Sequence, residues 1–145
     1  MKKLLKIAII LAITGIIAAA LVWKFYINKS HEDIDAAKPA FSIAAMDLWA
    51  QYNDNLQKAD SLYTGKVIEI SGILSRIENN DSLVSLIFVM DADSMFGDKT
   101  IRCQAYPKHN MEASELKPGS RVKVKGFCTG YNDTDIQLNK CSVIK

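Results

Sequence analysis

Two segments of this chain alternate apolar and polar residues and then meet a glycine, and this repeated pattern constrains the fold more than any other feature. The segments are Ile68-x-Ile70-x-Gly72 and Val122-x-Val124-x-Gly126. Alternation with a period of two places the apolar side chains on one face of a β-strand. Because glycine has no Cβ, a strand can bulge or bend sharply there. The pattern therefore predicts two strands that each bend at a glycine.

Five short strands are expected in all, with polar turns between them. A short helix or turn at Met111–Leu116 lies between the third and fourth strands, and Asn132–Asp135 forms the last turn. Bent short strands of this kind favour a small, partly open β-barrel or a sandwich. The strands are expected at Lys66–Ile77, Leu83–Met90, Thr100–Tyr106, Arg121–Cys128 and Ile136–Ile144.

An amphipathic helix is expected before the strands, from Ser42 to about Ser61. Its apolar positions recur at steps of four and three residues, which places them on one face of a helix. Trp49 and Tyr52 belong to this face, and aromatic residues at helical spacing are more often part of a core than a platform for stacking bases. The apolar positions are Ala45, Trp49, Tyr52, Leu56 and Ala59.

The N-terminal segment resembles a membrane anchor. Ile7 to Trp23 carries no charge, and three lysines precede it. Such a run is at the short end of what spans a bilayer, and Trp23 and Tyr26 suit the membrane interface. The positive-inside rule keeps the N-terminus in the cytoplasm and exports the rest. We therefore expect a single-pass inner-membrane protein with a periplasmic C-terminal domain.

A cleaved signal peptide is the alternative, because Ala18–Ala20 offers small residues at a cleavage site. The uncleaved anchor is favoured because the apolar run continues beyond that site. The expected organisation is an anchor at residues 1–27, a polar linker at 28–41 that contains Pro39, and a globular domain at 42–145.

Net charge limits the ligands of the exported part. The formal charge of the whole chain is +2, but three of its 18 basic residues precede the apolar run, which leaves 15 basic against 16 acidic residues. Affinity for nucleic acid depends on Lys and Arg that neutralise phosphates. A domain with a net charge of −1 lacks that excess, which disfavours nucleic acid as its ligand.

Several motifs together resemble the tRNA_anti-like OB-fold family of bacterial envelope proteins, over about residues 45 to 145. The resemblance implies an OB-fold barrel preceded by a helix, in proteins whose biochemical role is largely unassigned. The motifs are Tyr52-x2-Asn55-x3-Ala59-x3-Tyr63-x-Gly65-Lys66, Ile68-x-Ile70-x-Gly72, Leu116-x-Pro118-Gly119-x-x-Val122-x-Val124-x-Gly126-x-Cys128-x-Gly130, and Asp135-Ile136-x-Leu138-x-x-Cys141.

The three cysteines suggest one disulfide. Cys128 and Cys141 lie about six residues on either side of the expected last turn, so a hairpin would place them opposite one another. In an oxidising compartment they would form a bridge that stabilises the fold by roughly 3 kcal/mol. Two buried thiols are the alternative for a cytoplasmic domain. Cys103 is expected to be a core thiol.

Catalytic and metal-binding patterns are not found in the sequence. Asp91-x-Asp93-x4-Asp98 resembles part of a calcium loop but has Met95 and Phe96 where an oxygen ligand and a glycine are needed, so it is interpreted as a hairpin loop. His109 has no serine or cysteine at a motif spacing. A thiol redox enzyme is disfavoured because nothing lowers the pKa of Cys128 or Cys141. We expect no enzyme activity, metal or cofactor.

The sequence thus predicts a non-catalytic binding or assembly module in the periplasm. In addition to the bilayer, its partner is expected to be a peptide, a glycan or a protein. Acidic residues in the loops that rim an OB-fold cleft disfavour nucleic acid, although a tRNA- or single-strand-binding domain remains the alternative. The candidate contact residues are Phe88, Arg102, Gln104, Tyr106 and Tyr131.

Overall fold

The computed structural model describes residues 12–21, 34–92, 95 and 97–144. Contacts divide the chain into two units, Met1–Asp33 and Ile34–Lys145. In the first unit, residues 12–21 are helical and exposed. Among the described residues, no helix has both the length and the apolar character needed to span a bilayer. The expected anchor residues Ile7, Trp23 and Tyr26 lie outside the described residues.

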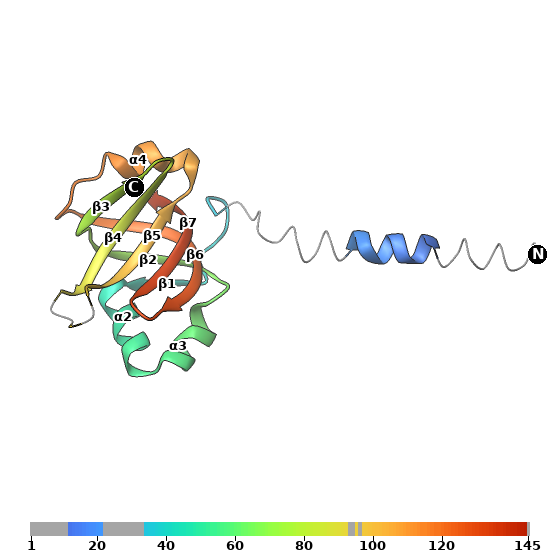
Figure 1. The fold of residues 1–145 in the computed structure, drawn as a ribbon, viewed down its shortest axis with the longest axis horizontal. Helices are drawn as coiled ribbons and strands as arrows, with labels where there is room; N and C mark the ends of the chain where they lie inside the picture. Colours follow the sequence, from blue (N-terminus) through green and yellow to red (C-terminus); the bar gives the residue numbers. More distant parts are fainter. Residues whose placement is uncertain (1–11, 22–33, 93–94, 96, 145) are drawn as a thin grey trace, which may run out of the picture. The chain divides into compact units, whose positions relative to one another are not determined.

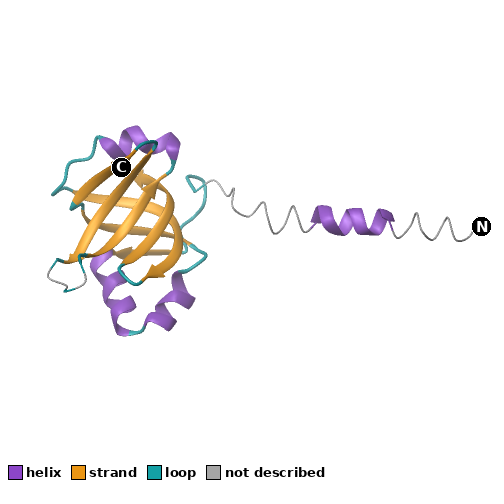
Figure 2. Cartoon of the chain, in the orientation of Figure 1, coloured by secondary structure: helices purple, strands orange, loops and turns teal. Residues whose placement is uncertain are grey.

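The second unit is built around a seven-stranded sheet, drawn in Figures 1 and 2. The order of strands is β1-β2-β6-β7-β5-β4-β3, with parallel pairs at β1–β2 and β5–β7 and antiparallel pairs elsewhere. The strands are β1 (Phe41–Ala44), β2 (Val67–Ile73), β3 (Arg76–Asn80), β4 (Leu83–Asp91), β5 (Lys99–Ala105), β6 (Arg121–Asn132) and β7 (Asp135–Ile144).

The mainly β prediction is confirmed, but the strand count is wrong. The segment expected as one strand over Lys66–Ile77 is two strands, β2 and β3, which have different neighbours. The chain switches neighbours at the residues between them, where Leu74 N–H donates to the Ser120 carbonyl and Ser75 N–H to the Ile87 carbonyl. The sheet is open, with β1 and β3 at its edges, rather than a closed five-stranded barrel.

The linker expected at residues 28–41 belongs in part to the domain. Ile34 is buried, and Phe41–Ala44 forms the edge strand β1 against β2. Ala40 N–H also donates to the Val67 carbonyl. The compact unit therefore begins at Ile34, ahead of the expected boundary at Ser42.

Helices lie at both ends of the curved sheet (Figure 2). At one end, α2 (Ala45–Asp54) and α3 (Leu56–Tyr63) replace the single helix expected from Ser42. The break occurs at Asn55, whose extended backbone interrupts the helix and whose side chain caps α3 by accepting from Lys58 N–H. At the other end are the 3-10 helix η3 (Pro107–His109) and α4 (Asn110–Ser114).

The aromatic residues of α2 belong to the core, as predicted. Tyr52 is buried, and Trp49 is part-buried with its ring 6.3 Å from that of Tyr131. Leu48 on the same helix is fully buried among residues of the sheet. Helix α2 therefore closes one end of the hydrophobic core.

Both glycines permit close packing, and Gly126 alone of the two lies at an irregularity of the sheet. The β2–β6 register runs without a shift through Gly72, where a Cβ would lie 2.9 Å from the Ala45 Cβ. At Gly126 a Cβ would lie 2.5 Å from Cys141 Sγ. The β6–β7 hairpin has a register shift between Lys125 and Phe127, at Gly126, so the irregularity expected at this glycine is observed whereas none occurs at Gly72. A second shift lies between Cys128 and Gly130.

These register shifts also correct the expected positions of the cysteines. Cys128 pairs with Leu138, whereas Cys141 lies three residues further on and is paired with Ala105 of β5. The cross-strand placement expected for Cys128 and Cys141 is therefore wrong. Cys103, Cys128 and Cys141 are all buried and free in the structure, and burial raises the pKa of Cys128 and Cys141.

Candidate functional site

Polar side chains of β3 and β5 lie on the outer face of the sheet. The register aligns Arg76 of β3 and Arg102 of β5 on either side of Ile87 of β4, which is apolar and fully buried. One step along, Ser85 lies opposite Gln104. Arg102 and Gln104 are both partly exposed.

Both arginines of this face are held by carboxylates. Arg76 lies 3.1 Å from Glu78 and 3.0 Å from Asp98. Arg102 lies 2.8 Å from the other Glu78 oxygen and 3.8 Å from Asp135. Hydrogen bonds from Arg102 and then Arg76 lower the pKa of Glu78, so the carboxylate stays charged near neutral pH. The network leaves little positive charge available to a ligand.

Three other expected contact residues lie elsewhere. Phe88 is fully buried and its ring lies against the position of Gly72, so its assignment as a surface contact is wrong. Tyr106 is 38% exposed, follows the end of β5 and has Lys108 Nζ 5.3 Å from its ring centre. Tyr131 packs against Trp49 and Tyr52 and donates to the Asp133 carbonyl. These residues do not form one site with Arg102.

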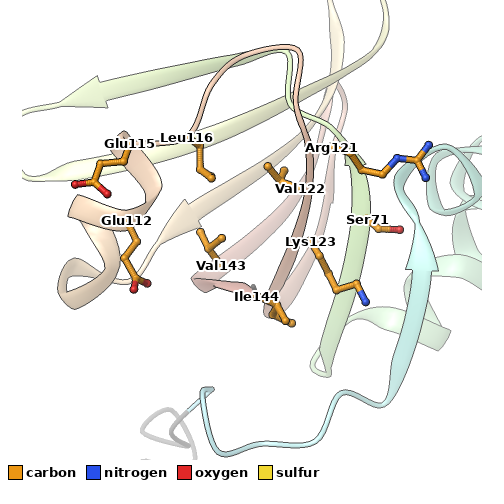
Figure 3. Close-up of a pocket in the computed structure, with 9 residues that line it drawn as sticks. All are labelled: Ser71, Glu112, Glu115, Leu116, Arg121, Val122, Lys123, Val143 and Ile144. Carbon is orange, nitrogen blue, oxygen red and sulfur yellow. The ribbon is translucent and has the colours of Figure 1, made fainter.

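An open pocket of about 570 Å³ lies between α4 and the ends of β2, β6 and β7. Figure 3 shows its apolar centre, with acidic side chains on the α4 side and basic side chains on the β6 side. The apolar centre is formed by Leu116, Val122, Val143 and Ile144, and the acidic and basic sides by Glu112, Glu115, Arg121 and Lys123, with Ser71 beside the basic side.

Asp35, at the start of the domain, forms ion pairs with residues close to this pocket. Its carboxylate lies 2.6 Å from Lys108 Nζ and 2.9 Å from His109 Nε2, and the other ring nitrogen of His109 lies 3.1 Å from Glu112. Lys125 Nζ donates to the carbonyls of Asp35 and Ala37. The Lys108 hydrogen bond, aided by His109, lowers the pKa of Asp35 to about 2. We call these contacts the Asp35 latch.

The latch predicts a local rather than a global effect for Asp35→Asn. Removing this charge should accelerate amide exchange over Ala36–Ala40 about two- to fivefold at pH 7, because partly exposed ion pairs contribute less than about 1 kcal/mol. The lowered pKa of Asp35 means that its stabilisation is present above about pH 4 and is lost as the pH falls through about 2. Mass spectrometry of amide exchange measures the first effect.

Asp47→Asn is the matched control, because Asp47 is an exposed carboxylate on α2. It should leave exchange over Ala36–Ala40 unchanged. Equal acceleration in both variants, or a loss of several kcal/mol of global stability in Asp35→Asn alone, would contradict a local latch.

The sequence predictions did not identify the pocket or the latch. The only local signals were the i, i+3 spacing of Glu112 and Glu115 and the exposed alternation of Arg121 and Lys123 around Val122. Nothing in either pattern indicates that the two lie across a pocket. Asp98, assigned to a solvated loop, instead pairs with Arg76.

Comparisons with known structures support the fold. A lipoprotein from Klebsiella pneumoniae subsp. pneumoniae MGH 78578, proposed to bind nucleic acid, is 17% identical with a TM-score of 0.57, over 72% of this chain and 91% of that chain. The tRNAIle2 agmatidine synthetase TiaS is 18% identical over 50% of this chain and 16% of that chain, with a TM-score of 0.33. The structure of yeast Stn1 and Ten1 is 11% identical over 76% of this chain and 65% of that chain, with a TM-score of 0.37.

The TM-scores of TiaS and of Stn1 and Ten1 are too low to support an argument. The search of curated proteins found no match. The tRNA_anti-like family, in contrast, matches residues 1–142. This match covers β1, the helices α2 and α3, and the later strands as far as Ser142 of β7. The chain belongs to the tRNA_anti-like family and has its OB-fold domain.

Proposed function

We propose that this protein is a non-catalytic binding or assembly module whose ligand is a peptide or a partner protein. In this proposal residues 1–27 hold it in the inner membrane, and the OB-fold domain lies in the periplasm. The observation that carries the proposal is the pairing of Arg76 and Arg102 with Glu78, Asp98 and Asp135. An OB-fold face that neutralises its own arginines suits a polar but uncharged contact with a polypeptide.

Binding of tRNA or single-stranded nucleic acid is the alternative function. Membership of the family and the proposed activity of the Klebsiella lipoprotein favour it. The charges oppose it, because nucleic-acid affinity comes from cations that release counterions from phosphates. Each arginine of the outer face is already within 4 Å of two carboxylates.

A pair of neutralising substitutions separates the two functions. The full-length chain in detergent should bind a fluorescent single strand or tRNA more weakly than about 100 μM at 150 mM salt. The double variant Glu78→Gln with Asp98→Asn removes both carboxylate partners of Arg76 and one of the two partners of Arg102. It should therefore raise the affinity for nucleic acid several-fold and make that affinity fall more steeply with salt. Fluorescence anisotropy measures both.

Asp47→Asn with Asp54→Asn is the control, because it removes two negative charges from α2 rather than from this face. It should raise the affinity less than the first pair. Micromolar binding by the unchanged protein, with a steep dependence on salt, would establish the alternative.

The location is tested by a reporter fused after Lys145. An enzyme that is active only outside the cytoplasm should be active in this fusion, because the lysines before Ile7 are retained in the cytoplasm. Activity of a reporter that works only inside the cell would overturn the periplasmic location.

A further inference from the structure

The pocket beside α4 contains charged groups that the domain does not neutralise. The side chains of Glu115 and Arg121 form no hydrogen bond or ion pair with another residue in the described part of the chain. Glu112 is 3.1 Å from His109, and Lys123 is 3.4 Å from Glu69, so these two are partly satisfied. Glu115 and Arg121 are therefore the charged groups of the pocket that a ligand of opposite charge would pair with most readily.

The centre of the pocket is apolar. Val122 is buried, and Leu116, Val143 and Ile144 are part-buried around it. Pockets of roughly 300–1,000 Å³ with apolar walls and a few polar groups are typical of ligand sites, and this one has a volume of about 570 Å³. An apolar group seated there would remove further apolar surface from water.

The two charged sides select among ligand classes. A polyanion would be attracted by Arg121 and Lys123 but repelled by Glu112 and Glu115, and a neutral sugar would cover these charges without pairing them. A ligand that fits has an ammonium at one end, a carboxylate at the other and an apolar group between. A short polypeptide segment with a basic and an acidic side chain has this chemistry.

We propose that this pocket binds a short segment of a partner polypeptide, with a basic side chain against Glu115, an acidic side chain against Arg121 and an apolar side chain over Val122 and Val143. The inference rests on the proposed function and assigns it a site. Helix α4 and its C-cap residue Glu115 supply one charged side and strand β6 the other, so the distance between them selects the spacing of charges in the segment (Figure 3).

The test uses fluorescent, blocked peptides and the full-length chain in detergent. The probe Lys-Leu-Val-Glu should bind at least fivefold more tightly than Glu-Leu-Val-Glu or Lys-Leu-Val-Lys, because each like-charged peptide meets one repelling side. Arg121→Glu should weaken binding of the mixed peptide about tenfold and strengthen that of the doubly basic one. Glu115→Lys should weaken the mixed peptide and strengthen the doubly acidic one.

The chain offers matched controls for both variants. Lys117→Glu changes the net charge as Arg121→Glu does, and Asp54→Lys as Glu115→Lys does, at exposed residues that do not line the pocket. Both controls should bind all three peptides as the unchanged protein does. If the controls shift the affinities as much as the pocket variants, or if the three peptides bind equally or not at all, the inference is overturned.

These outcomes are distinct from a failure of the proposed function. Loss of the peptide preference removes this site but leaves a protein that does not bind nucleic acid. Salt-sensitive micromolar binding of nucleic acid removes the proposed function whatever the peptides do.

Discussion

Replacing Gly126 by alanine is expected to destabilise the domain by about 3 kcal/mol, as estimated for overpacking of a tight core. The new Cβ would lie 2.5 Å from Cys141 Sγ and 3.3 Å from Leu138 Cβ. Cys141 is 1% exposed and lies in the core of the domain, so its sulfur has little room to move. Urea unfolding of the full-length chain, followed by near-ultraviolet circular dichroism, measures the loss.

A double variant separates the clash from a general intolerance of change at Gly126. In Gly126→Ala with Cys141→Ala, the new methyl group occupies space that the sulfur has left, so the double variant should be more stable than Gly126→Ala alone. Gly119→Ala tests backbone strain by itself, because its φ is +86° and nothing lies within 4 Å of the added Cβ. It should cost about 1 kcal/mol. A double variant less stable than Gly126→Ala would contradict the clash.

Replacing Phe88 by alanine should cost about 4 kcal/mol of unfolding free energy, within the range for truncation of a buried aromatic residue. Phe88 has 0% exposed surface and lies against the position of Gly72, so alanine leaves a cavity that the sheet cannot readily collapse. Since small domains are stable by roughly 5–15 kcal/mol, this loss would remove a large part of the free energy of unfolding. Thermal and urea unfolding measure the change.

Leu83→Ala is the control on the same strand, because Leu83 is 39% exposed. It should cost about 1 kcal/mol or less. If Phe88→Ala unfolded like the unchanged protein but lost affinity for a ligand, the inward orientation of Phe88 would be wrong and it would belong to a binding surface.

Periodic patterns of apolar residues gave correct predictions where the outcome depends on a single helix or strand. The apolar spacing that includes Trp49 and Tyr52 predicted a helix whose aromatic residues belong to the core, and both pack there. Alternation predicted β-structure around Ile70 and Val124, which lie opposite one another in β2 and β6. These outcomes depend on periodicity, which is present in any short window of sequence.

Predictions that needed a partner across the sheet were less reliable. The position of Cys141 depended on the β6–β7 register, which two shifts alter. Phe88 was assigned to a surface, although alternation alone leaves open which face of β4 is buried. Only the packing of α2 against β2 and β4 decides that Phe88 faces inward.

The sequence by itself determined a mainly β domain with a helical segment between residues 45 and 63, and a body whose charges nearly cancel. Only the tertiary structure decided how those charges are used. It neutralises Arg76 and Arg102 by pairing them with Glu78, Asp98 and Asp135. It leaves Glu115 and Arg121 without a partner among the described residues, on two sides of one pocket. The physical reason is that periodicity depends on neighbours in sequence, whereas strand register and ion pairing depend on packing between distant segments.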